Sequence, residues 1–231
     1  MSVGGDWTVA LGAPGTIVVT ELVRYDDLGR SSRERPGALI ELASTEVAGR
    51  RLACTTLGWR RLGSVDGQVA ATLDLERRPG EVEGGGWSKP MELLGEQTRA
   101  TLCTDSSRGS RLRGPLRYLS VGDGRWCWHF VGGRTAGEEL VLARGREPGG
   151  DPVVRTFPAA QGRSLGRTAG GATFDRHVTS WSSDAELREV LLAELFATAK
   201  LDGLVDYRAA RVMEGVQELT GYVPRVEGNT E

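Results

Sequence analysis

Cys127 and His129 lie two residues apart in a run that alternates with aromatic side chains. If this run is a β-strand, its side chains alternate between two faces, so the thiol and the imidazole share one face. A cysteine beside a histidine can act as a nucleophile with its base. No carboxylate at a suitable spacing orients the histidine, so we predict no catalytic residues here.

The other face of the same run would carry three aromatic side chains, Trp126, Trp128 and Phe130. Two interpretations follow from this pattern. The aromatics can form the hydrophobic core of a sheet or barrel, or they can line a pocket for a small apolar ligand. The sequence leaves both open, and the three residues are our candidate ligand-binding set.

Four guanidinium groups fall within ten residues, at Arg108, Arg111, Arg113 and Arg117. This density could neutralise several phosphates of an anionic lipid surface, so these arginines are the candidate anion-binding set. The alternative is a solvated loop. Nucleic acid is not an expected partner, because no aromatic residue is interleaved for base stacking and the formal net charge of the chain is -2.

Two further groups are expected to be structural. His177 lies beside Asp175 just before an apolar segment, and the pair would fix the entrance of a helix there. Glu194 lies inside the run Val190 to Ala197. A buried carboxylate needs a partner, and we predict one of the many arginines.

Metal and cofactor sites are not indicated. The three cysteines, Cys54, Cys103 and Cys127, are widely spaced and form no C-x-x-C pair. The sequence also lacks phosphate-loop, dinucleotide-binding, HExxH and GxSxG motifs. We predict no metal and no cofactor, and nothing in the residues supports an enzyme.

The beginning of the sequence predicts a cytoplasmic location. Residues 1–6 include an acid and no basic residue, unlike the start of a secretory signal. The charge-free stretch 7–20 is shorter than a membrane span and is interrupted by Gly12, Pro14 and Gly15. We therefore expect no transmembrane segment.

Most of the chain, about residues 7–157, has the composition of short β-strands separated by turn residues. Asp66-Gly67 and Gly122-Asp123-Gly124 predict tight hairpin turns. Residues 78–90 are predicted to be a flexible loop or an internal boundary. The candidate strands are 16–23, 39–43, 51–57, 72–77, 99–104, 116–121, 125–131, 139–144 and 153–157.

Two helices are predicted near the end. The capping-box spacing from Ser183 to Glu186 opens a helix over about 184–201, whose apolar residues surround it, so it should be buried. Residues 206–220 carry a single apolar face and predict a surface helix, which could also form the seam of a homodimer.

Together these elements predict one mainly β domain over 1–231: an antiparallel β-barrel or curled sheet wrapped around the helix 184–201, plus the amphipathic helix. This arrangement resembles the tubby C-terminal and phospholipid-scramblase-like superfamily, which includes the LURP-one-related proteins. The likeness is carried by the turn 122–124 with the strand 125–131, and by residues 174–178 leading through Trp181 into the helix.

The resemblance implies a closed barrel around one hydrophobic helix and a binding or scaffold function. Some members recognise phosphoinositide headgroups through basic residues, but no Lys/Arg pair in this sequence matches that site. We expect a non-catalytic binding or scaffold protein of the cytoplasm whose partner is a protein or an anionic surface. The alternative is a β-barrel that binds a small ligand, or acts on it, in a cavity lined by aromatics.

Overall fold

The computed structural model describes residues 11, 18–22, 39–76, 86–110, 114–131, 139–158, 176–199 and 201–205. This part of the chain is mainly β, as predicted, with one long helix, α2 (Leu187–Thr198), and the single turn α3 (Asp202–Val205). The strands are β1 (Val18–Leu22), β2 (Ile40–Val47), β3 (Arg50–Leu57), β4 (Arg60–Val65), β5 (Gln68–Asp74), β6 (Ser88–Leu93), β7 (Glu96–Ser110), β8 (Gly114–Val121), β9 (Trp126–Val131), β10 (Glu139–Arg144), β11 (Pro152–Pro158) and β12 (Arg176–Trp181).

All strand pairings are antiparallel and, from β1 to β12, each strand pairs with the next one along the chain. β1 also pairs with β12, so the order of the strands closes on itself. Short turns make this meander possible. Asp66 and Gly67, with φ values of 49° and 81°, form the hairpin turn that the sequence predicts.

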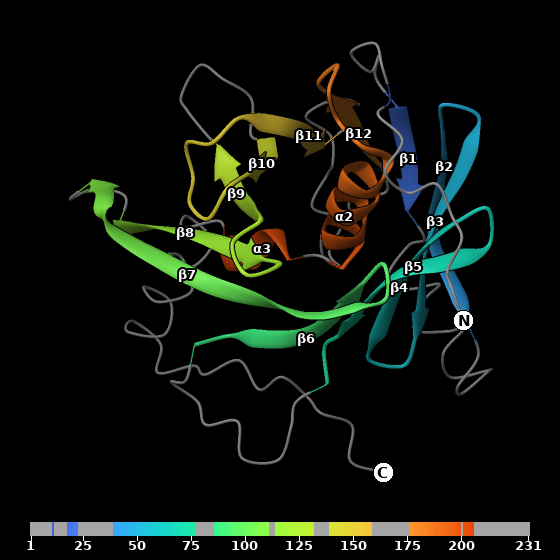
Figure 1. Cartoon of the computed structure of the whole chain (residues 1–231), viewed down its shortest axis with the longest axis horizontal. Coiled ribbons are helices and arrows are strands. Elements are labelled where there is room, and N and C mark those ends of the chain that lie inside the picture. Colours follow the sequence, from blue (N-terminus) through green and yellow to red (C-terminus); the bar gives the residue numbers. More distant parts are fainter. Residues whose placement is uncertain are drawn as a thin grey trace, which may run out of the picture.

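Helix α2 lies among the strands (Figure 1) and packs against β2 to β5 on one side and β10 to β12 on the other. Its apolar residues face several directions, which explains why strands surround it. Ten of its residues are buried, including Leu191, Leu192 and Phe196. The main hydrophobic core is therefore the layer between this helix and the inner face of the sheet.

The helix is shorter than predicted at both ends. It begins at Leu187 with Glu186 as its N-cap residue, and the backbone N–H of Glu186 donates to Glu189 Oε2 at 2.9 Å. The predicted capping box at Ser183 is wrong, because residues 183 and 184 form a turn. There the Ser182 hydroxyl donates to the Asp184 carboxylate at 2.6 Å instead.

Several strand predictions need correction. Residues 88–90 belong to β6 and not to a loop, and β12 adds a strand beyond the predicted limit near residue 157. β7 extends to Ser110, well past the predicted end at 104. The predicted helix over 206–220 and the dimer seam on it lie outside the described residues. Among the helices that the structure describes, none has the length and apolar character needed to cross a membrane.

Candidate functional site

The three aromatic residues of β9 lie in the hydrophobic core. Trp126 and Trp128 are 2% and 0% exposed, and Phe130 is buried beside them. The Trp128 ring lies 5.5 Å, centroid to centroid, from the ring of Phe196 on α2. The structure thus places the candidate ligand-binding set in the hydrophobic core, where Trp126 and Trp128 contact the helix.

A charged network joins the start of α2 to the sheet. Glu189 is 1% exposed, and its two carboxylate oxygens accept hydrogen bonds from Nε and Nη2 of Arg144, each at 2.8 Å. Trp126 Nε1 donates to the same carboxylate at 3.0 Å. Arg144 also forms an ion pair with Asp184 at 2.5 Å. This bidentate geometry fixes the helix entrance against β9 and β10.

The pKa of Glu189 follows from these contacts. Burial by itself would raise the pKa of this carboxyl, but the hydrogen bonds from Arg144 and Trp126 outweigh burial and lower the pKa below its ordinary value. Glu189 is therefore ionised at neutral pH although it is buried. The paired charge holds Arg144 in place and raises the pKa of its guanidinium.

A second buried carboxylate, Glu194, anchors the other half of the helix. Its Oε2 lies 2.7 Å from Nε2 of His177 on β12, and its Oε1 accepts a hydrogen bond from the Thr179 hydroxyl. The prediction that Glu194 is buried and paired agrees with this arrangement. The prediction of an arginine partner is wrong, because Arg144 pairs with Glu189 and β12 brings a histidine and a threonine to Glu194.

The surroundings of Glu194 are polar but closed to solvent. Thr156 and Thr198 are both buried near it, and Thr198 donates back to the helix carbonyl of Glu194 at 2.8 Å. Burial, with a smaller contribution from the negative charge of Glu194, raises the pKa of the Cys54 thiol to about 12. Cys54 is consequently a neutral thiol, which does not suit a nucleophile.

His177 was expected to pair with Asp175, which lies outside the described residues. Its imidazole uses Nε2 for Glu194, and its buried Nδ1 has no hydrogen-bond partner among the described residues. The contact ties β12 to α2, so His177 acts beside the middle of the helix and not at its entrance.

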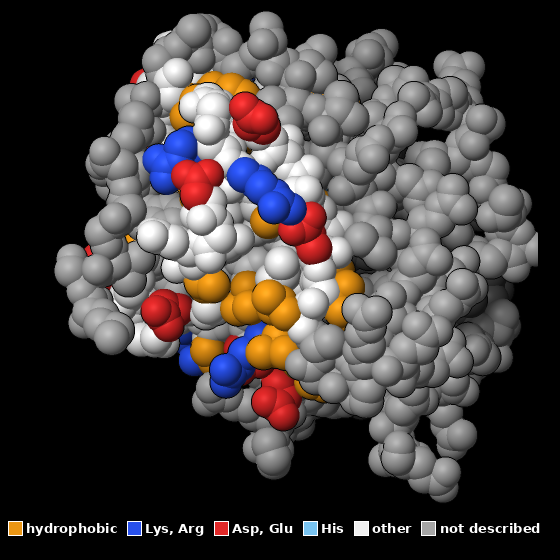
Figure 2. Space-filling view, turned by 90° about the vertical axis from the view of Figure 1, so that its right-hand side faces the viewer, with side chains coloured by type: hydrophobic (Ala, Val, Ile, Leu, Met, Phe, Trp, Pro, Cys, Tyr) orange, Lys and Arg blue, Asp and Glu red, His pale blue; other side chains and the backbone are white. Residues whose placement is uncertain are grey.

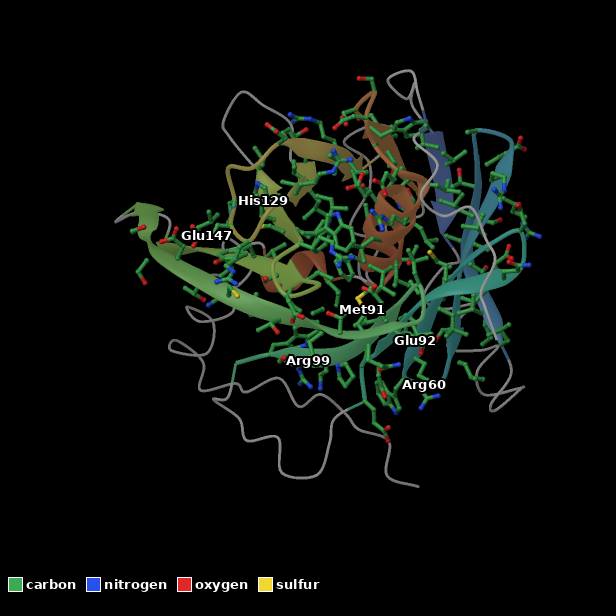
Figure 3. All side chains as sticks on the ribbon, viewed as in Figure 1. Arg60, Met91, Glu92, Arg99, His129 and Glu147 are labelled. Atoms are coloured by element: carbon green, nitrogen blue, oxygen red, sulfur yellow. The ribbon has the colours of Figure 1, made fainter. Side chains whose placement is uncertain are left out.

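Cys127 and His129 share the opposite face of β9 from the aromatics, as the alternation predicts. The Cys127 sulfur lies 3.8 Å from His129 Nδ1, and both side chains are buried. Burial, and then the charge of Arg155, lower the pKa of His129 to about 4. Figure 3 labels His129 and Glu147 on the same side of the molecule. A thiol of this burial beside a weakly basic imidazole is a poor nucleophile pair.

The candidate anion-binding arginines fall on the longest hairpin. β6 pairs with β7 from Glu96 to Thr101, and β9 pairs with β8 from Tyr118 to Val121. Beyond these points the described parts of β7 and β8 pair with each other, up to Ser110 and Gly114. We call residues 105–117 the β7–β8 arm, and Figure 1 shows this green hairpin extending past the other strands.

Arg108 and Arg117 lie on the two strands of the arm, while Arg111 and Arg113 lie outside the described residues. The sequence leaves a solvated loop open for this segment, but most of it is strand. The spacing of the arginines does not predict that this hairpin extends beyond its neighbouring strands, because that depends on where β6 and β9 stop pairing with β7 and β8.

An exposed apolar surface that the sequence analysis did not identify lies at the turn between β3 and β4. Trp59 is 64% exposed, Leu39 is 60% exposed and Leu57 is 39% exposed. The pairing of Ile40 with Thr56 places Leu39 opposite Leu57. The sequence Leu57-Gly58-Trp59 between two strands was the available signal, since a glycine there marks a turn that presents its neighbour to solvent.

Among the described residues, no group of three or more His, Cys, Asp or Glu side chains is arranged to hold a metal ion. Comparisons with protein-family models, with curated proteins and with solved structures find no match to this chain.

Proposed function

We propose that this chain is a non-catalytic binding protein of the cytoplasm, in which the strands form a barrel around α2 and the β7–β8 arm binds an anionic lipid surface. The observation that carries the proposal is that the described strands of the arm pair with each other and with no third strand. The resemblance to the tubby C-terminal and scramblase-like superfamily is consistent with this architecture and is part of the proposal.

The charge of the arm supports an anionic partner. Residues 105–117 contain four arginines and one aspartate, although the chain as a whole has a net charge of -2. The described strands of the arm pair with no third strand, and a two-stranded hairpin on its own is marginally stable. An anionic surface attracts closely spaced arginines, with each arginine near the surface contributing about 1 kcal/mol.

Co-sedimentation with vesicles tests this proposal. The full chain is mixed with phosphatidylcholine vesicles with and without phosphatidylserine, at low and at moderate salt. We expect binding that requires phosphatidylserine and weakens with salt. The triple variant Arg111→Ser, Arg113→Ser, Arg117→Ser should lose about 3 kcal/mol of binding, or roughly 150-fold in affinity.

A matched control removes three arginines from the body of the protein, Arg51, Arg146 and Arg155, with the same change in net charge. This variant should keep most of its binding. Equal losses in the two variants, or no binding of the wild-type chain to phosphatidylserine vesicles, would overturn the proposal. A stoichiometric protein partner with no vesicle binding would make the chain a scaffold protein instead.

One observation favours a second candidate function, the binding of a small ligand. Nε1 of Trp128 is buried and has no hydrogen-bond partner among the described residues, whereas Nε1 of Trp126 donates to Glu189. A buried indole N–H usually finds an acceptor, and a ligand carbonyl could supply it. Environment-sensitive dyes should then bind and be displaced by the ligand, and Trp128→Phe should abolish that binding without unfolding the protein.

A further inference from the structure

The outer face of the sheet near the β3–β4 turn carries a row of residues from adjacent strands. Cross-strand pairing aligns Leu57 with Arg60, and Arg60 with Asp74. Leu39 extends the row on one side through β2, and Pro90, paired with Arg99, extends it on the other. Trp59 lies at the end of this row, on the turn next to Arg60. We call Leu39, Leu57, Arg60, Asp74 and Pro90, together with Trp59 at the turn, the β3–β5 face.

The turn that presents Trp59 is held firmly. The carbonyl of Gly58 accepts hydrogen bonds from the Thr56 hydroxyl at 2.9 Å and from Arg61 Nη1 at 3.0 Å. The carbonyl of Trp59 accepts a hydrogen bond from the backbone of Leu75 at 3.0 Å. An exposed tryptophan on a fixed turn loses little conformational entropy when it is buried by a partner, which suits an interface anchor.

The charges of this face are complementary to one another. Arg60 and Asp74 are direct cross-strand neighbours, yet no salt bridge joins them within the described part of the chain. Figure 2 shows hydrophobic side chains gathered on the right-hand side of the molecule as seen in Figure 1, with acidic and basic side chains next to them. Figure 3 shows Arg60, Glu92 and Arg99 at the lower end of the sheet, with Met91 inside it.

We propose that the β3–β5 face is a homodimer interface, occupied by the same face of a second copy of this chain. A two-fold axis between Arg60 and Asp74 places each arginine against the aspartate of the other copy, so two equivalent ion pairs form. The same axis places Leu57 against Pro90 of the second copy. Trp59 is buried at the edge of the contact. A surface with neighbouring opposite charges is self-complementary in this way, whereas a surface of one sign is not.

Sedimentation velocity of the purified full chain over a range of concentrations tests the proposal. We expect a reversible monomer–dimer equilibrium. Trp59→Ser, Arg60→Asp and Asp74→Arg should each weaken dimerisation by at least about tenfold, since each single charge reversal sets like charges against each other twice. The double variant Arg60→Asp, Asp74→Arg should restore the dimer, because the exchanged charges pair again across the axis.

Val131→Ser is the matched control, because Val131 is also an exposed apolar residue but lies on β9, away from this face. It should leave the dimer unchanged. Circular dichroism establishes that each variant is folded. A wild-type chain that stays monomeric at all concentrations, or a double variant that dimerises no better than the single ones, would overturn the proposal.

Discussion

Nε2 of His177 and Oε2 of Glu194 lie 2.7 Å apart, with side-chain exposures of 7% and 2%. They are seventeen positions apart in the sequence, and the contact joins β12 to α2. With the Arg144–Glu189 contact, it gives the helix two carboxylate anchors on different parts of the sheet. The helix is therefore held by specific polar contacts in addition to its apolar packing.

Glu194→Gln should destabilise the protein at neutral pH. The amide cannot accept from both His177 and Thr179 as the carboxylate does, so one buried donor is left poorly satisfied. We expect the free energy of unfolding to fall by about 2 to 3 kcal/mol in urea titration. Glu46→Gln, at an exposed position of β2, is the control and should have little effect. An unchanged melting temperature for Glu194→Gln would contradict the buried contact.

The lowered pKa of Glu189 predicts that the protein loses stability in acid. Its pKa is lowered in the folded chain, so its ionised form contributes stability at neutral pH, and this contribution is lost as the pH falls below the ordinary carboxyl value and through the lowered one. Urea unfolding between neutral pH and a pH of about 3 should show this decline. Glu189→Gln should unfold more easily at neutral pH and should show a flatter decline; an equally steep decline would contradict the assignment.

The sequence predicts the individual strands and turns of this fold better than it predicts which elements lie next to each other. β9 alternates as expected, and Asp66-Gly67 forms its turn, because period and turn chemistry are local properties. β6 was missed because Gly84-Gly85-Gly86 and Pro90 favour a loop locally, while pairing with β7 makes residues 88–93 a strand. Tertiary pairing decides such cases.

The candidate site shows the same limit. Burial of Glu194 follows from its apolar neighbours, but its partner depends on the register of β12, which no local pattern specifies. The predicted arginine was reasonable by count, since arginines are numerous and the chain has only two histidines. The exposure of Trp59 likewise depends on which elements pack near the β3–β4 turn, and no local pattern specifies that.

The lowered pKa of His129 predicts a second, separate dependence of stability on pH. Its pKa is lowered to about 4, so between pH 6.5 and about 4 the unfolded chain binds a proton there that the folded chain does not. Stability should therefore fall by roughly 3 kcal/mol over this window as the pH decreases. Proton NMR should show an imidazole that titrates near 4. A midpoint near 6.5 would show that His129 is not buried as described.

Gly63 tests how closely α2 approaches the sheet. A Cβ atom at this position of β4 would lie 3.2 Å from Cγ and Cδ1 of Leu191, which is fully buried. Gly63→Ala should cost about 1 to 3 kcal/mol of unfolding free energy by overpacking this contact. Leu191→Ala in the same chain should relieve the crowding, so the double variant should lose less than the sum of the single losses. Gly86→Ala is the matched control, because a Cβ there meets nothing within 4 Å. Strict additivity of the two core substitutions would show that the helix does not press against β4 at this glycine.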